Sequence, residues 1–213
     1  MKQHLYVEGK DYFFIGKLCE THFPIPKGFS EDTKKQFLKG GGGYNDVLPR
    51  FINSLDTSDL ENIGLIVDAD FGSVQKRFSE IIKGLSKKLN RDFSKYALNT
   101  EGVIIEEEGL PKIGIWLMPD NVNNGYLEYF IEQLIDSQDI ILREAKSTVD
   151  FLMTKDYCPF TDFKKQKAIV HSWLAWQETP GLPFGSALDT KYLNAHAESA
   201  QPFLNWIKKT FEF

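Results

Sequence analysis

Cysteine is scarce in this sequence, which has only Cys19 and Cys158 among 213 residues and no CxxC pair. Two isolated cysteines favour free thiols in the core of a protein from a reducing compartment over a disulfide framework. Long hydrophobic runs are also missing. No stretch approaches about 18 apolar residues, and the first residues contain no apolar signal-peptide region. We therefore expect a cytoplasmic protein without a membrane segment.

Positive charge is not in excess, because the formal net charge is -5 at pH 7. This excludes a histone-like polycation, and any contact with nucleic acid must use a local basic patch, a metal ion or both. Two kinds of motif are absent as well. No GKS or GKT follows the four glycines 40–43, and no Gx-Ser-xG elbow occurs. We therefore expect neither a bound nucleotide cofactor nor acyl-transfer chemistry, and the glycines predict a tight turn.

Apolar residues, by contrast, make up 42% of the chain, which is enough to bury a core. Apolar strand-like runs alternate with helical spacings along the first two thirds. This alternation predicts an α/β fold with a mainly parallel sheet flanked by helices. We expect strands at 4–9, 34–39 and 62–70, with the second running into the glycine turn at 40–43, and a pair within 102–121. The expected helices are 11–23, 44–55, 73–89, 125–135, 139–153, 162–178 and 199–211, with a loop at 179–188.

The domain organisation follows from the same pattern. We expect an α/β core over residues 1–136 and a helical extension over 137–213, packed together as one compact unit. His171 and the four tryptophans lie in apolar surroundings in this reading, so we interpret them as packing residues. The oligomeric state stays open.

Acidic residues follow three of the expected strands. Glu8 ends the first strand, Asp68 and Asp70 end the run "GLIVDAD", and Asp120 follows the strand before Glu128. Residues two apart in a strand point to the same side, so Asp68 and Asp70 share a face if the strand reaches Asp70. Parallel neighbouring strands would bring these acids to the sheet edge where open α/β folds bind ligands.

Clustered carboxylates repel one another unless a cation neutralises them, and hard divalent ions such as Mg²⁺ prefer carboxylate oxygens. The pattern therefore predicts a Mg²⁺ or Mn²⁺ site. Each acid taken alone could instead cap a helix or lie in a solvated loop. Asp120 and Glu128 are the most open cases, because the neighbouring Asn121 and Gly125 also suit a plain turn.

"YVEGKD" near the start and "GLIVDAD" further on resemble the Toprim pattern, which has a glutamate after its first strand and Asp-x-Asp after a later one. "IGIWLMPDNVNNGYLEYFIEQLI" and "HSWLAWQETPGLPFGSAL" are similar to a family of stand-alone Toprim-like bacterial proteins. Those proteins are grouped near the OLD-type (overcoming lysogenization defect) nucleases. The resemblance covers nearly the whole chain.

The resemblance implies a Toprim-like sheet of roughly four strands and a catalytic site in which Glu8, Asp68 and Asp70 hold Mg²⁺ or Mn²⁺. In OLD-type nucleases further acids and a lysine complete a two-metal site. The matching residues here are Asp120, Glu128, and Lys164 or Lys167, and the two lysines would also contact nucleic acid. One position departs from the pattern. Tyr12 stands where the family carries a second acid, and Asp11 precedes it on what we expect to be a different face of the turn.

Three functions remain open from the sequence. The first is metal-dependent phosphodiester cleavage of nucleic acid, with Glu8, Asp68, Asp70 and Lys167 as catalytic residues. The second is a Toprim-shaped module that binds nucleic acid or a partner without cutting, which Tyr12 favours. The third is a haloacid-dehalogenase-like phosphatase with Asp68 as nucleophile. That family's motif normally stands near the N-terminus, whereas this one comes third in strand order.

Overall fold

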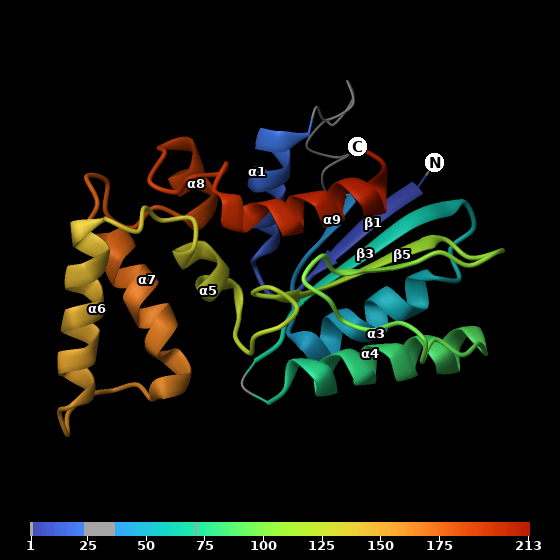
Figure 1. Ribbon diagram of the computed structural model, residues 1–213, viewed down its shortest axis with the longest axis horizontal. Coiled ribbons are helices and arrows are strands. Elements are labelled where there is room, and N and C mark those ends of the chain that lie inside the picture. Colours follow the sequence, from blue (N-terminus) through green and yellow to red (C-terminus); the bar gives the residue numbers. More distant parts are fainter. Residues whose placement is uncertain (1, 24–36, 71) are drawn as a thin grey trace.

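The computed structural model describes residues 2–23, 37–70 and 72–213. Their centre is a five-stranded sheet with the order β2-β1-β3-β5-β4 (Figure 1). Strands β1 (Lys2–Val7), β2 (Leu38–Lys39), β3 (Leu60–Asp68) and β5 (Lys112–Met118) run parallel, and β4 (Val103–Ile105) pairs antiparallel with β5. The expected α/β class with a mainly parallel sheet is confirmed.

Strand β3 lies in the middle of the sheet because its apolar run can be buried on both faces. Ile63, Leu65 and Val67 point to one face and pack with helices α3 (Tyr44–Ser54) and α4 (Val74–Leu89). Ile66 points to the other face. Helix α4 shows the expected amphipathic spacing, and the Oγ of Ser73 caps its start by accepting from the Lys76 amide.

The second face of the sheet is covered by α1 (Tyr12–His22), α5 (Leu127–Glu132) and α9 (Gln201–Phe211). Helix α9 approaches the strands closely at two glycines that pair across β3 and β5, Gly64 and Gly114. A Cβ at Gly114 would lie 2.5 Å from the Thr210 Oγ1, and one at Gly64 would lie 2.9 Å from the Phe211 Cζ. The missing side chains therefore make room for α9.

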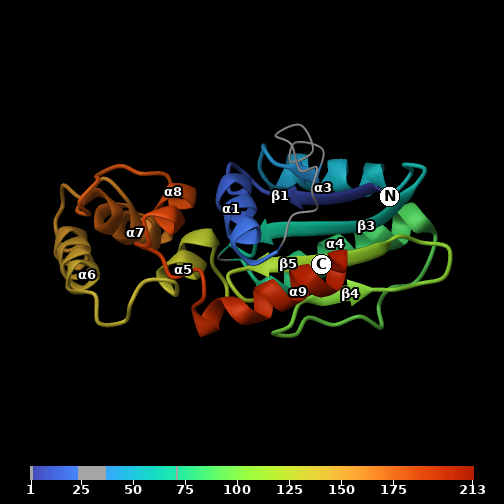
Figure 2. The same cartoon turned by 90° about the horizontal axis from the view of Figure 1, so that it is seen from above.

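The remaining helices lie beyond the end of the sheet. Helices α6 (Ile140–Met153) and α7 (Lys165–Ala175) pack against each other at the end furthest from β4, as Figure 2 shows. A short 3₁₀ turn, Asp162–Lys164, leads into α7, and α8 (Phe184–Asp189) packs on α1. Among the described residues, no helix has the length and apolarity needed to cross a bilayer.

Four details of the sequence prediction are wrong. Strand β3 ends at Asp68, so it does not reach Asp70. The segment 179–188 is not all loop, because α8 begins at Phe184. Helix α5 is only six residues long, and the sheet has five described strands rather than about four. The strand expected at 34–39 is present at Leu38–Lys39 and runs into the glycine turn, and residues 34–36 lie outside the described residues.

The helices of the C-terminal segment lie in two places. Helix α9 belongs to the layer that covers the sheet, whereas α6 and α7 lie away from it. Both cysteines are free, as expected, and Cys19 is buried in the core. Among the tryptophans, Trp116, Trp173 and Trp206 are buried packing residues, and Trp176 is 45% exposed.

Candidate acidic site

Glu8 follows β1 and lies between the end of β3 and the start of α3. Its Oε2 accepts a hydrogen bond from the Asp68 amide (3.1 Å), and its Oε1 accepts one from the Tyr44 amide (3.0 Å). Burial raises the pKa of Glu8 and the Asp70 charge adds to it, although the two amide bonds oppose the shift. The expected convergence of Glu8 with the aspartate strand is therefore present.

The glycine-rich segment passes this edge as a tight turn, as expected. Gly41 donates to the Gly9 carbonyl (2.7 Å), and Gly9 donates to the Gly42 carbonyl (2.8 Å). All three have positive φ, which suits glycine. This pairing joins the turn after β1 to the turn after β2 and places the start of α3 beside Glu8.

Asp68 lies among the other acids of the site. It ends β3, and its Oδ1 accepts a hydrogen bond from the Leu127 amide at the start of α5 (3.1 Å). Its pKa is raised well above the ordinary value by burial first, and then by the charges of four other acids: Asp11, Glu8, Glu128 and Asp70. Five carboxyl groups therefore converge at this edge of the sheet.

Asp70 reaches the site by a turn and not by strand alternation. Its φ is 55°, and its backbone forms an antiparallel bridge with Gly125. The side chain forms an ion pair with Arg77, whose guanidinium lies 3.8 Å from the centre of the Tyr44 ring. Asp70 thus has a fixed cationic partner from the first turns of α4.

Asp11 is the acid that the sequence reading placed wrongly. It precedes α1 as the N-cap residue, but its side chain forms no capping bond. Burial and the charges of Glu128 and Glu8 raise its pKa from 3.8 to about 7, against the opposing charge of Lys167. Its position three residues after Glu8, in the same turn, was the available signal.

Tyr12 brings no carboxylate to this acidic group. Its ring lies so close to Gly40 that a Cβ there would be 1.8 Å from the Tyr12 Cδ1. The residue that departs from the Toprim-like pattern therefore packs over the glycine turn, and Asp11 supplies the neighbouring negative charge instead.

Glu128 joins the site from α5 and is buried with 6% exposure. The Lys167 Nζ lies 3.0 Å from its Oε1, and the His171 Nε2 lies 3.8 Å from the same atom. Burial alone would raise the pKa of Glu128, but His171 and Lys167 outweigh it and lower the pKa. The expectation that His171 is a packing residue is wrong, because its side chain is 56% exposed; it is a neighbour of the acidic group, and its ring lies beside Phe184.

Asp120 is engaged elsewhere. Its Oδ1 accepts from the amides of Val122 (3.0 Å) and Asn123 (2.7 Å), and its Oδ2 accepts from the Asn123 side chain (2.7 Å). Asp120 is therefore part of a plain turn, which is one of the two alternatives that the sequence left open for it. Glu128, the other open case, lies with the other acids.

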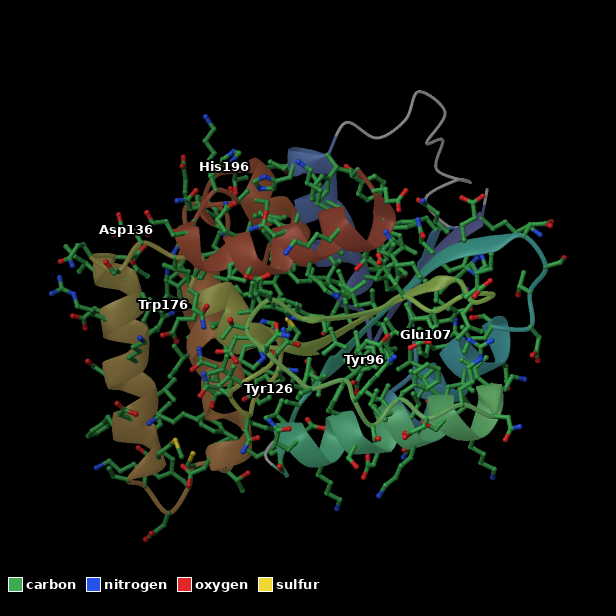
Figure 3. The ribbon with its side chains drawn as sticks, turned by 45° about the vertical axis from the view of Figure 1, so that its right-hand side comes forward. Tyr96, Glu107, Tyr126, Asp136, Trp176 and His196 are labelled. Atoms are coloured by element: carbon green, nitrogen blue, oxygen red, sulfur yellow. The ribbon has the colours of Figure 1, made fainter. Side chains whose placement is uncertain are left out.

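A small cavity opens beside the two aspartates. It measures about 110 Å³ and is lined by Asp68, Asp70, Tyr126, Phe163, Lys164 and Lys167. Tyr126, labelled in Figure 3, immediately precedes α5, and its hydroxyl donates to the Phe163 carbonyl (2.8 Å). Both lysines predicted from the sequence therefore line the same cavity as Asp68 and Asp70.

The carboxylates have protein partners in this conformation. Backbone amides bind Glu8, Arg77 pairs with Asp70, and Lys167 pairs with Glu128. In the described parts of the chain, no three His, Cys, Asp or Glu side chains are arranged to hold a metal ion. A metal ion at this edge would compete with Arg77 for Asp70 and with Lys167 for Glu128.

The fold and site define an α/β protein with a partly buried group of carboxyls at the C-terminal edge of a parallel sheet. The chain belongs to the family described as "Protein of unknown function (DUF3226)", whose family model matches residues 2–212. Comparison with curated proteins and with solved structures gives no match.

Proposed function

We propose that this protein is a Toprim-like, metal-dependent phosphodiesterase that acts on nucleic acid, with a site related to that of OLD-type nucleases. The observation that carries the proposal is the convergence of Glu8, Asp11, Asp68, Asp70 and Glu128 beside a cavity lined by two lysines. The acids come from the ends of β1 and β3 and from α5. This is the edge at which open α/β sheets bind ligands.

The donor set fits a hard divalent cation such as Mg²⁺ or Mn²⁺, which takes carboxylate oxygens. Burial and then mutual repulsion raise the pKa values of Asp68 and Asp11, and a bound cation would relieve the repulsion. Glu8, Asp68 and Asp70 would hold the first ion, and Asp11 and Glu128 are the candidates for a second. We leave out Asp120, because its own turn uses both of its oxygens.

A bound divalent ion would activate a water molecule and stabilise charge on the phosphate. The chain's own residues supply orientation and positive charge. Two backbone amides fix Glu8, and one fixes Asp68. Lys164 and Lys167, at the cavity, would face the phosphate and stabilise its negative charge.

A cleavage assay tests the proposal. Wild type, Asp68→Asn, Glu8→Gln and Asp120→Asn are incubated with supercoiled plasmid, linear DNA and RNA in Mg²⁺ or Mn²⁺. We expect metal-dependent cleavage by wild type and Asp120→Asn, and a loss of at least about 100-fold in the other two, as is typical for groups that stabilise a transition state. Equal cutting by all four proteins would show that the site assignment is wrong.

The second candidate is a Toprim-shaped module that binds without cutting. The ion pairs of Asp70 with Arg77 and of Glu128 with Lys167 favour it, because they already neutralise two of the acids. Mn²⁺-dependent thermal stabilisation of wild type, lost in Asp68→Asn and without cleavage of any substrate, would support this candidate over the nuclease.

A further inference from the structure

We propose that Phe163 is a base-stacking residue, and that the substrate is a nucleic-acid strand with an unpaired base beside the acidic site. The inference rests on the proposed function for the class of ligand. It adds a binding element that the acids and lysines alone do not define. The segment Asp162–Lys164 carries an aromatic ring and an ammonium group to the cavity that Asp68 and Asp70 line.

The Phe163 ring is partly exposed to solvent, and hydrogen bonds fix the backbone around it. Phe163 is 48% exposed, although most phenylalanines in the described chain are buried. The Tyr126 hydroxyl donates to the Phe163 carbonyl at 2.8 Å, and the Lys164 amide donates to the Thr161 carbonyl at 2.8 Å. The Tyr126 and Phe163 rings lie 6.0 Å apart at 44°. A half-exposed ring on a fixed backbone loses little freedom when a flat group stacks on it.

The size of the cavity argues for part of a long ligand. Its volume of about 110 Å³ is well below the roughly 300–1,000 Å³ of pockets that enclose a whole small molecule. One base or one phosphate can enter, while the rest of the ligand must lie outside. A strand meets this condition, because its neighbouring nucleotides continue over the surface.

The charges around the ring match a strand as well. Lys164 is exposed, and within the described residues no acid forms an ion pair with its ammonium. Lys167 lies one helical turn further on, over the Tyr126 ring at 5.7 Å. Aromatic rings interleaved with lysines bind single strands by stacking on bases and pairing with phosphates. A duplex end with stacked bases would leave the Phe163 face unused.

The test compares two ligands with the same phosphates, an oligothymidine of about eight nucleotides and an entirely abasic strand of equal length. Binding is measured by fluorescence anisotropy in EDTA and in Ca²⁺. We expect wild type to prefer the oligothymidine by roughly five- to 150-fold, which is the stacking contribution of one base. Phe163→Ala and Phe163→Leu should abolish this preference, and Phe163→Trp should keep it. Leucine keeps the apolar bulk of the side chain but has no flat ring. Loss of the base preference in both Phe163→Ala and Phe163→Leu therefore shows an effect on stacking rather than on folding.

Phe151→Ala is the matched control, because Phe151 is 58% exposed but lies on α6, away from the cavity. It should keep the wild-type preference. Unchanged base preference in Phe163→Ala, or no strand binding by wild type, would overturn the inference. The cleavage assay tests the proposed function independently of this inference. Base-dependent binding through Phe163 without cleavage would contradict the phosphodiesterase proposal and would still support this inference.

Discussion

The ammonium of Lys167 lies 3.0 Å from the carboxylate of Glu128, and the two residues come from helices α7 and α5. The lysine side chain is 54% exposed, whereas the glutamate side chain is 8% exposed. This pair ties the helical end of the molecule to the acidic edge of the sheet. It also sets the charge balance of the site, because Lys167 opposes the raised pKa of Asp11.

Replacing Lys167 with methionine should destabilise the protein by about 1–2 kcal/mol, because a buried carboxylate loses a charged hydrogen-bond partner. Lys165→Met is the control from the same helix, since Lys165 pairs with the more exposed Asp150. That change should lower the free energy of unfolding by no more than about 0.5–1 kcal/mol. Urea denaturation at pH 7 in EDTA measures both values. Equal losses in the two variants would contradict a special role for the Glu128 pair.

Asp11 predicts a pH dependence of stability in metal-free buffer. Its pKa is about 7 in the folded protein against an ordinary 3.8. Between these values the folded state holds a proton that the unfolded state releases, so stability falls as pH rises. The penalty is absent below about pH 4 and complete above about pH 7. Asp68, whose pKa is also raised, adds in the same direction.

Asp11→Asn should therefore be more stable than wild type at pH 8 and equal to it near pH 4. We expect a gain of at least about 1.4 kcal/mol at pH 8, the value of one pKa unit. Asp136→Asn, the same change at an exposed acid, is the control and should not reproduce the gain at pH 8. Denaturation curves from pH 4 to 8 in EDTA supply the measurement. A variant that tracks wild type at every pH would show that Asp11 is not buried among charges.

Arg77 should compete with a metal ion for Asp70. Removal of its charge by Arg77→Gln is expected to tighten Mn²⁺ binding about fivefold, on the order of 1 kcal/mol for one nearby ion pair. Lys76→Gln removes the same charge one residue away, from an exposed side chain without a contact to Asp70. Calorimetric titration with Mn²⁺ compares the three proteins. Weaker binding in Arg77→Gln would instead mean that the arginine positions Asp70 for the ion.

Gly114→Ala should destabilise the sheet–helix contact by about 1–3 kcal/mol, because the new methyl group overlaps the side chain of Thr210. Thr210→Ala in the same protein should restore part of the loss, since the Oγ1 and Cγ2 that the methyl meets are then absent. Gly72→Ala is the control, as a Cβ there meets no atom within 4 Å. Thermal unfolding compares wild type, Gly114→Ala, Thr210→Ala, the double variant and Gly72→Ala. Additive effects of the two changes on stability would show that the new methyl group does not overlap the Thr210 side chain.

Local sequence determined the sheet and its acidic edge. The apolar run from Ile63 to Val67 needs burial on both faces, which puts β3 at the centre of a parallel sheet. Glu8 directly follows β1 and Asp68 ends β3, so parallel pairing brings them together without further information. The glycine turn was equally readable, because consecutive glycines suit positive φ.

Tertiary contacts decided the rest, because they join segments far apart in the chain. The left-handed turn at Asp70 depends on its bridge to Gly125, and the direction of Asp11 depends on the packing of α1. Helix α8 forms within a Pro- and Gly-rich stretch because Gly185 fits closely against the backbone of α1 at Phe13. Neither strand periodicity nor helical spacing contains such pairings. The sequence therefore determined which acids could come together. The tertiary structure determined their ion-pair partners, which are Arg77 for Asp70 and Lys167 for Glu128.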